Sequence, residues 1–122
     1  MKYLLLLHTP DDGLPPDAGS PEYADMHARY TAAMGAMAQA GVLIECAPLR
    51  AWSSATTVRV RDGETLLTDG PAAEIKEQVG GYALIECADL DDALKWAATI
   101  PAAQIGSIEV RAVADTPAPA PR

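Results

Sequence analysis

The chain offers three side chains whose types suit proton transfer, and two of them are its only histidines. His8 and His27 carry the imidazole, which ordinarily titrates between about pH 5 and 8. Asp69 carries a carboxylate that could accept a proton or orient a partner group. We therefore take His27, Asp69 and His8 as the candidate catalytic residues. The alternative for both histidines is structural: His8 is solvated at a strand end, and His27 only hydrogen-bonds at a helix edge.

A tyrosine and two arginines are the candidate ligand-binding residues. Tyr30 is three residues from His27, so the two side chains are neighbours on one helix surface. Arg59 and Arg61 alternate outward on a predicted strand, where guanidinium groups suit a carboxylate or phosphate. Alternatively, Tyr30 belongs to the core and the arginines pair with glutamates across strands. If the helix carries an acid–base group, His27 is a better candidate than Tyr30, and Asp69 must lie beside it at one cavity.

Asp69 opens the tripeptide Asp69-Gly70-Pro71, which also has a structural interpretation. An aspartate carboxylate can accept backbone N–H bonds, glycine permits a positive φ, and proline presets φ for a helix start. Every residue of the tripeptide then has a turn role, so we favour this interpretation. A short helical turn is predicted from Pro71 to about Gln78, ended by Gly80-Gly81.

The composition predicts one soluble domain and disfavours several classes of function. Of 122 residues, 49% are apolar and 21% are charged, as in ordinary globular domains. The net charge of −8 disfavours nucleic acid and anionic membranes as partners, because both need a basic patch. The N-terminal apolar run is too short for a signal peptide or a membrane span. We therefore expect a cytoplasmic protein.

The two cysteines, Cys46 and Cys87, are expected to be buried free thiols of a reducing compartment. Their wide separation, without a histidine pair nearby, lacks the spacing of a zinc site. The sequence also lacks a glycine-rich phosphate loop. We therefore expect neither a metal nor a cofactor.

Hydrophobic periodicity predicts an alternation of strands and helices. The strand over residues 2–8 is apolar on both faces. One helix begins behind the N-cap Ser20 and continues to about residue 40, where Gly41 ends it. A second helix begins behind Asp89 and stops at Pro101. The other predicted strands are 42–46, 56–61, 64–68, 82–87 and 107–113, with a hairpin turn at Asp62-Gly63 and with Val58 and Val60 facing inward.

This order predicts an α+β protein of the ferredoxin-like split βαβ kind, in which an antiparallel sheet carries two helices on one face. The domain covers residues 1–114, and the Pro/Ala-rich residues 115–122 are expected to form a disordered tail. Because the first strand is apolar on both sides, a lone domain exposes an apolar sheet face. A homodimer formed through the sheet faces is the expected partner arrangement.

Several separated segments of the chain resemble the YCII-related, or DGPF-domain, family. Residues 68–74 are similar to the DGPF signature, with Ala72 where the family has Phe. The likeness covers about residues 1–113, with its segments in the family's order. The other similar segments are 2–6, 57–63, 76–82, 96–98 and Ile100-Pro101.

The resemblance implies a dimeric ferredoxin-like α+β barrel. Some YCII-like proteins are proposed to use a histidine on the first helix with an aspartate, and one relative removes chloride from a chlorinated hydroquinone. The matching helix position here is Tyr30, with His27 one turn earlier. One implied function is binding of, or action on, a small organic molecule in a pocket at the helix–sheet and dimer barrel. Bacterial DGPF proteins also accompany extracytoplasmic-function sigma factors, which implies, as an alternative, a non-catalytic accessory module of transcriptional regulation.

Overall fold

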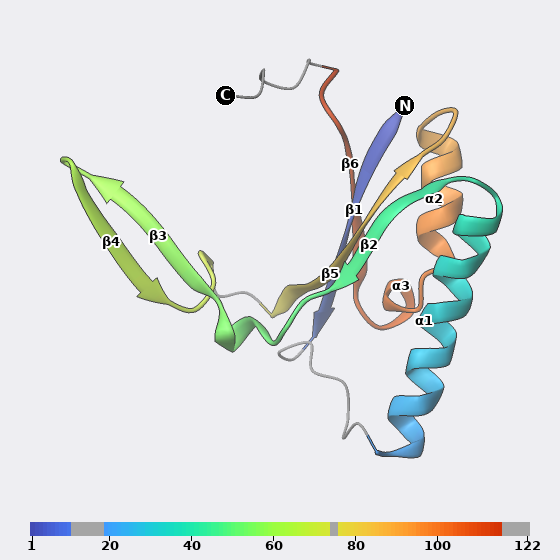
Figure 1. Ribbon diagram of the computed structural model, residues 1–122, viewed down its shortest axis with the longest axis horizontal. Helices are drawn as coiled ribbons and strands as arrows, with labels where there is room; N and C mark the ends of the chain where they lie inside the picture. Colours follow the sequence, from blue (N-terminus) through green and yellow to red (C-terminus); the bar gives the residue numbers. More distant parts are fainter. Residues whose placement is uncertain (11–18, 74–75, 116–122) are drawn as a thin grey trace.

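The fold is a four-stranded antiparallel sheet with helices on one face and a separate hairpin (Figure 1). It comes from a computed structural model that describes residues 1–10, 19–73 and 76–115. The elements in chain order are β1 (Lys2–Pro10), α1 (Pro21–Gln39), β2 (Leu43–Pro48), the 3₁₀ helix η1 (Trp52–Ser54), β3 (Thr56–Arg61), β4 (Glu64–Asp69), β5 (Glu77–Glu86), α2 (Leu90–Ala98), α3 (Ala102–Ile105) and β6 (Ser107–Ala112). Most of the expected tail, residues 116–122, lies outside the described residues.

Two interleaved βαβ units make up the sheet, whose strand order is β2-β5-β1-β6. α1 connects β1 with β2, while β5 is inserted between them, and α2 and α3 connect β5 with β6 around β1. All neighbouring strands are antiparallel. The expected α+β class and ferredoxin-like arrangement are therefore confirmed. No helix of the described residues is long and apolar enough to cross a membrane.

The helix boundaries follow the predicted caps. The Ser20 side-chain oxygen accepts a hydrogen bond from the Tyr23 N–H at 3.1 Å, and Asp89 accepts one from the Asp92 N–H at 2.9 Å. Each cap satisfies an N–H group that the first helical turn leaves unpaired. Gly41 follows α1 with a φ of 75°, which glycine adopts at little cost.

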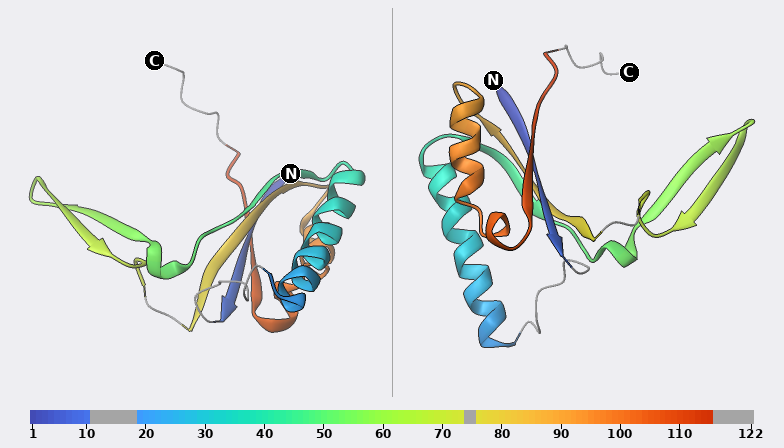
Figure 2. Two further views of the ribbon diagram at one scale, coloured as in Figure 1. Left: turned by 60° about the horizontal axis from the view of Figure 1, so that its bottom comes forward. Right: turned by 180° about the vertical axis from the view of Figure 1, so that it is seen from behind.

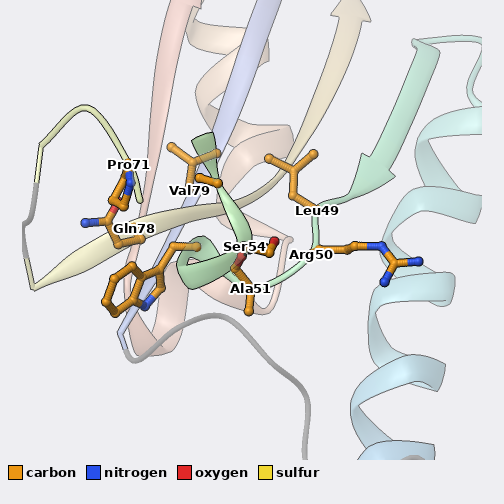
Figure 3. Close-up of a pocket in the computed structure, with 9 residues that line it drawn as sticks. Leu49, Arg50, Ala51, Ser54, Pro71, Gln78 and Val79 are labelled. Carbon is orange, nitrogen blue, oxygen red and sulfur yellow. Dashed lines mark hydrogen bonds between the residues drawn. The ribbon is translucent and has the colours of Figure 1, made fainter. Parts of the chain in front are cut away.

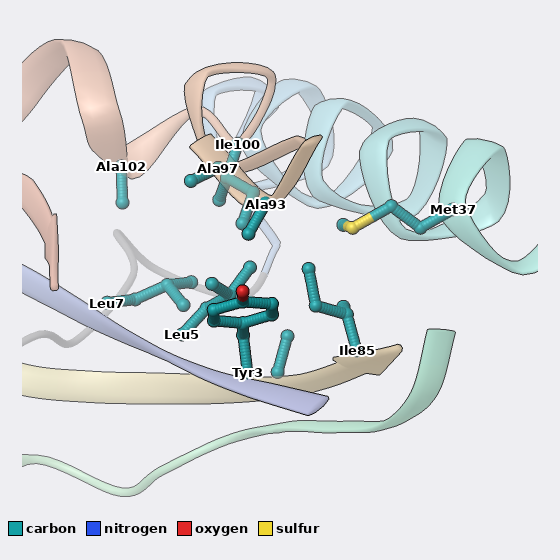
Figure 4. Packing of buried hydrophobic residues seen from close by; sticks show 10 residues of the cluster. Tyr3, Leu5, Leu7, Met37, Ile85, Ala93, Ala97, Ile100 and Ala102 are labelled. Carbon is teal, nitrogen blue, oxygen red and sulfur yellow. The ribbon is translucent and has the colours of Figure 1, made fainter. Parts of the chain in front are cut away.

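The core lies between the sheet and the helices (Figure 4). Alternate residues of the two central strands point toward the helices, as the period of a strand requires. α2 contributes alanines, whose small side chains let this helix lie close to the sheet. The buried residues are Tyr3, Leu5 and Leu7 of β1, Met37 of α1, Ala83 and Ile85 of β5, Ala93 and Ala97 of α2, and Ile100 and Ala102.

The predicted helical turn from Pro71 to Gln78 is wrong in its described part. The residues on either side of 74–75 are bends, and β5 already begins at Glu77 and continues through Gly80-Gly81. The glycines extend the strand because they allow β2 to come close. A Cβ on Gly81 would lie 3.1 Å from the Ala47 carbonyl oxygen.

The inward orientation predicted for Val58 and Val60 is also wrong, since the two residues are 61% and 60% exposed, respectively. β3 and β4 form a two-stranded sheet of their own, which projects from the side of the main sheet opposite the helices (Figure 2). No layer of the described residues lies beneath it. Its turn is as predicted, with positive φ at Asp62 and Gly63, as a two-residue hairpin loop requires.

Two glycine substitutions are expected to change stability in opposite directions. A Cβ on Gly106, between α3 and β6, would clash with the backbone carbonyl of His8, whereas one on Gly35 in α1 would meet nothing within 4 Å. Gly106→Ala is therefore expected to lower the free energy of unfolding by at least about 2 kcal/mol. Gly35→Ala should raise it by about 0.5–1 kcal/mol, because alanine favours helix. Urea denaturation measures both, and equal stabilities for the two variants would contradict this packing.

Candidate functional site

A groove of about 940 Å³ lies between α1 and the sheet. Residues of β1, α1, β2, β5 and α3 line it, and most of them are apolar. The lining includes no Asp, Glu, Lys or Arg among the described residues. Its polar side-chain groups belong to Tyr23, Tyr30, two threonines, one cysteine and His27. A large apolar groove with a few polar groups is the usual form of a small-molecule site.

One stripe of α1 forms the helical wall of the groove. Tyr23, His27, Tyr30 and Met34 follow one another at intervals of four, three and four residues, and such positions share a helix face. The same helix inserts Met37 into the core, fully buried. The C-terminal half of α1 therefore packs on the sheet, and its N-terminal half extends past the end of the sheet (Figure 1). This divergence leaves the groove open.

The two candidate residues of α1 differ in exposure. His27 is exposed, and its ring stacks on that of Tyr23 with centroids 6.0 Å apart. Tyr30 is half-buried, and burial raises the pKa of its hydroxyl. The Tyr30 hydroxyl therefore stays protonated near neutral pH and can donate a hydrogen bond. Together they place an imidazole at the rim of the groove and a phenol deeper within it.

Thr9 contributes a polar group to the sheet side of the groove. Its hydroxyl oxygen is buried and has no hydrogen-bond partner among the described residues. A buried hydroxyl without a partner costs about 1–3 kcal/mol.

The edge strand β2 brings a cysteine to the groove, whereas Tyr82 of the neighbouring β5 alternates with the buried Ala83 and directs its side chain to the opposite face of the sheet. Cys46 is exposed, so the expectation of a buried thiol is wrong for this residue, because β2 lies at the sheet edge. Cys87 is half-buried. The Tyr82 hydroxyl donates to a Glu45 carboxylate oxygen at 2.6 Å. This hydrogen bond raises the pKa of Tyr82 and holds its ring on the sheet face opposite the helices.

His8 lies on the sheet face opposite the helices, away from the groove. Its Nε2 is 3.0 Å from the Glu109 carboxylate, which also accepts a hydrogen bond from Arg111 at 3.2 Å. These hydrogen bonds, first from His8 and then from Arg111, lower the pKa of Glu109. The cluster therefore joins β1 to β6 on the open face of the sheet.

The remaining predicted site residues lie on or beside the hairpin, not in the groove. Asp69 is exposed at the end of β4, and its carboxylate has no hydrogen bond within residues 1–10, 19–73 and 76–115. Arg59 donates to the Ala72 carbonyl at 3.4 Å, and Arg61 donates to the neighbouring Val60 carbonyl at 3.0 Å. Of the six candidates, the structure thus brings only the two of α1 to one cavity.

A second, smaller cavity of about 370 Å³ lies at the base of the hairpin (Figure 3). Pro71 and Gln78 line it together with the loop before β3, while Arg50 points away from both (Figure 3). Gly70 closes the hairpin beside it: its N–H donates to the Ala55 carbonyl at 2.7 Å, and its φ is 103°. Within the tripeptide, Gly70 therefore forms the turn, and the Asp69 carboxylate contributes no hydrogen bond to this turn within the described residues.

Sequence reasoning missed Thr9 and Tyr23 as groove residues. The spacing of the α1 stripe contained the signal for Tyr23, since it continues the helix face of His27 and Tyr30 by one turn. Thr9 could not be found in this way, because a strand pattern does not say which edge of the sheet a helix leaves open.

Comparison with known proteins gives two matches. The family model described as YCII-related domain matches residues 1–117 of the chain. An uncharacterized protein of Rhizobium meliloti (strain 1021) is 46% identical over 78 residues, which are 62% of this chain and 63% of that protein. The matched region thus spans less than two thirds of that relative's length.

The open-face cluster leads to a prediction about titration. Because the pKa of Glu109 is lowered, its contacts stabilise the fold above the ordinary glutamate pKa, and this contribution is lost as the pH falls through the lowered value. NMR titration of the side-chain carboxyl should show the lowered pKa. His8→Ala should raise it more than Arg111→Ala does. A pKa that neither substitution moves would contradict the geometry of the cluster.

Proposed function

The chain belongs to the YCII-related domain family, and on that premise we propose that it binds a small organic molecule in the groove between α1 and the sheet. The observation that carries the proposal is the groove itself: about 940 Å³ of mostly apolar lining with His27 and Tyr30 on one wall. Sites for small organic molecules have volumes of about 300–1,000 Å³ and similarly few polar groups.

The lining suits a ligand with an apolar, preferably aromatic body and one polar or anionic end. Tyr23 and Tyr30 offer ring faces and edges to an aromatic body. His27 and the Tyr30 hydroxyl are donors for an anionic group at the rim, since an imidazole carries positive charge when protonated. The uncharged remainder of the lining disfavours a strongly charged ligand, because burial of an unpaired charge is costly.

Binding is favoured over acid–base catalysis because no carboxylate lines the groove among its described residues. His27 is the candidate proton acceptor if the bound molecule reacts, but Asp69 lies on the hairpin and would not orient it within one chain. The histidine would then act alone, without the third group that usually fixes an imidazole tautomer.

The proposal includes a homodimer formed through the open face of the sheet. Leu4 and Leu6 of β1 and Leu84 of β5 point to this face and are half-buried, with no helix of the described residues above them. Such a continuous apolar patch in the middle of a sheet marks an interaction surface. A two-fold dimer would cover it with the same patch of a second copy.

A pair of substitutions on α1 tests the groove. Ala38 lines it and Ala36 does not, and both residues are exposed on the same helix. Ala38→Trp should fill the groove and raise the Kd for anilinonaphthalenesulfonate, an aromatic anion, at least about tenfold, which corresponds to about 1.4 kcal/mol. Fluorescence titration measures the Kd, and Ala36→Trp is the matched control that should leave it unchanged.

Substitution of the polar side chains distinguishes their contribution to binding from that of the apolar lining. Tyr30→Phe and His27→Gln should weaken binding of the anionic probe more than that of a neutral aromatic probe. Equal affinity of Ala38→Trp and its parent would exclude the groove as the site. A parent that binds neither probe would favour the accessory-module function, linked to sigma-factor-type regulation.

The dimer is tested by a charge placed on the open face. Leu6→Glu should convert a dimer of the 12.8 kDa chain into a monomer, because a carboxylate cannot be buried there without a partner. Sedimentation velocity measures the mass at micromolar concentration. Leu94→Glu, at a position 46% exposed on α2, is the control. A parent that sediments as a monomer would contradict the proposal.

A further inference from the structure

The β3–β4 hairpin has one face that is apolar and open to solvent. Cross-strand partners share a face, and here Val58 pairs with Leu67 and Val60 with Thr65. The three apolar residues of this face are 61%, 70% and 60% exposed in that order. An isolated two-stranded hairpin is at best marginally stable in water. The hairpin therefore presents a surface that a second protein surface would stabilise.

The opposite face of the hairpin is polar and is bonded to the hairpin's own base. The Thr57 hydroxyl donates to the Gly70 carbonyl at 2.8 Å, and Arg59 donates to the Ala72 carbonyl at 3.4 Å. These bonds fix the position of the hairpin relative to the loop at its base. They leave the face of Val58, Val60 and Leu67 as the one that is unoccupied among the described residues.

We infer that the β3–β4 hairpin is an arm whose apolar face packs against a second copy of the chain. This inference rests on the dimer proposed above. The hairpin projects from the side of the sheet opposite the helices (Figure 2), which is the side that the open face presents. A second copy seated on the open face would therefore lie beside the arm. Each copy would receive the arm of the other, as two-fold symmetry requires.

The size of the contact supports this occupant. Four strands about 4.8 Å apart and about six residues long give a sheet face of roughly 400 Å² of flat area. Stable interfaces bury about 600–1,000 Å² per partner. Two hairpin strands of the same length add roughly 200 Å². The arm thus brings the sheet contact to the lower end of the range of stable dimers.

The charges of the arm also favour a second copy. The chain has a net charge of −8, so charged surfaces of two copies repel each other, whereas an apolar contact adds no local repulsion. On the apolar face of the hairpin the only charged side chain is Asp69, at its base. A basic partner would instead be recognised by several carboxylates.

The test replaces the apolar face while keeping residues that favour strands. The triple variant Val58→Thr, Val60→Thr, Leu67→Thr should raise the dimer Kd at least about tenfold in sedimentation equilibrium. Leu66→Thr, on the polar face at 45% exposure, is the matched control and should leave it unchanged. An unchanged Kd for the triple variant would overturn the inference while leaving the sheet-face dimer in place. A monomeric parent would overturn both.

A crosslink measured without disrupting the arm gives a second, independent test. A photoreactive phenylalanine analogue at position 67, in an otherwise unchanged chain, is irradiated in a mixture of ¹⁴N- and ¹⁵N-labelled protein. Mass spectrometry should find mixed-isotope crosslinks between position 67 and the second copy. Crosslinks confined to one chain, or formed only with another protein when one is added, would overturn the inference.

Discussion

The structure depends on β1, a central strand that is apolar on both faces. It pairs with β5 on one side and β6 on the other, so its side chains lie in the middle of both faces of the sheet. Tyr3, Leu5 and Leu7 are buried by the helices, while Leu4 and Leu6 point to the face where no described helix lies. A one-residue change of register would exchange these two sets. The helical layer buries the apolar side chains on one face of the strand, and the proposed dimer would bury those on the other.

The groove follows from the way α1 meets this sheet. Met37 anchors the C-terminal half of the helix in the core, and the remainder diverges beyond the strands. The half-buried Tyr30 consequently packs against the core and lines the groove, while the exposed His27 lies at the rim. The hairpin is the counterpart of this arrangement on the other side of the sheet. Both features place apolar side chains in positions that a single copy of the chain leaves uncovered, one suited to a small molecule and the other to a protein.

Local features of the fold were predictable because they depend on neighbouring residues. The caps at Ser20 and Asp89 and the turn at Asp62-Gly63 each need only the geometry of a few bonds. The fate of Val58 and Val60 was not predictable, since alternation identifies an apolar face but not the layer that covers it. The site shows the same division: helical spacing joined His27 to Tyr30, whereas the position of Asp69 depends on where the hairpin projects.

In the proposed dimer, the second face of β1 is covered by another copy of the chain. Isotope-filtered NOE spectroscopy on a mixture of ¹³C-labelled and unlabelled protein tests it directly, because it detects only contacts between copies. Intermolecular NOEs to the methyl groups of Leu4, Leu6 and Leu84 are expected. Their absence, with these methyl groups showing contacts only within their own chain, would contradict it.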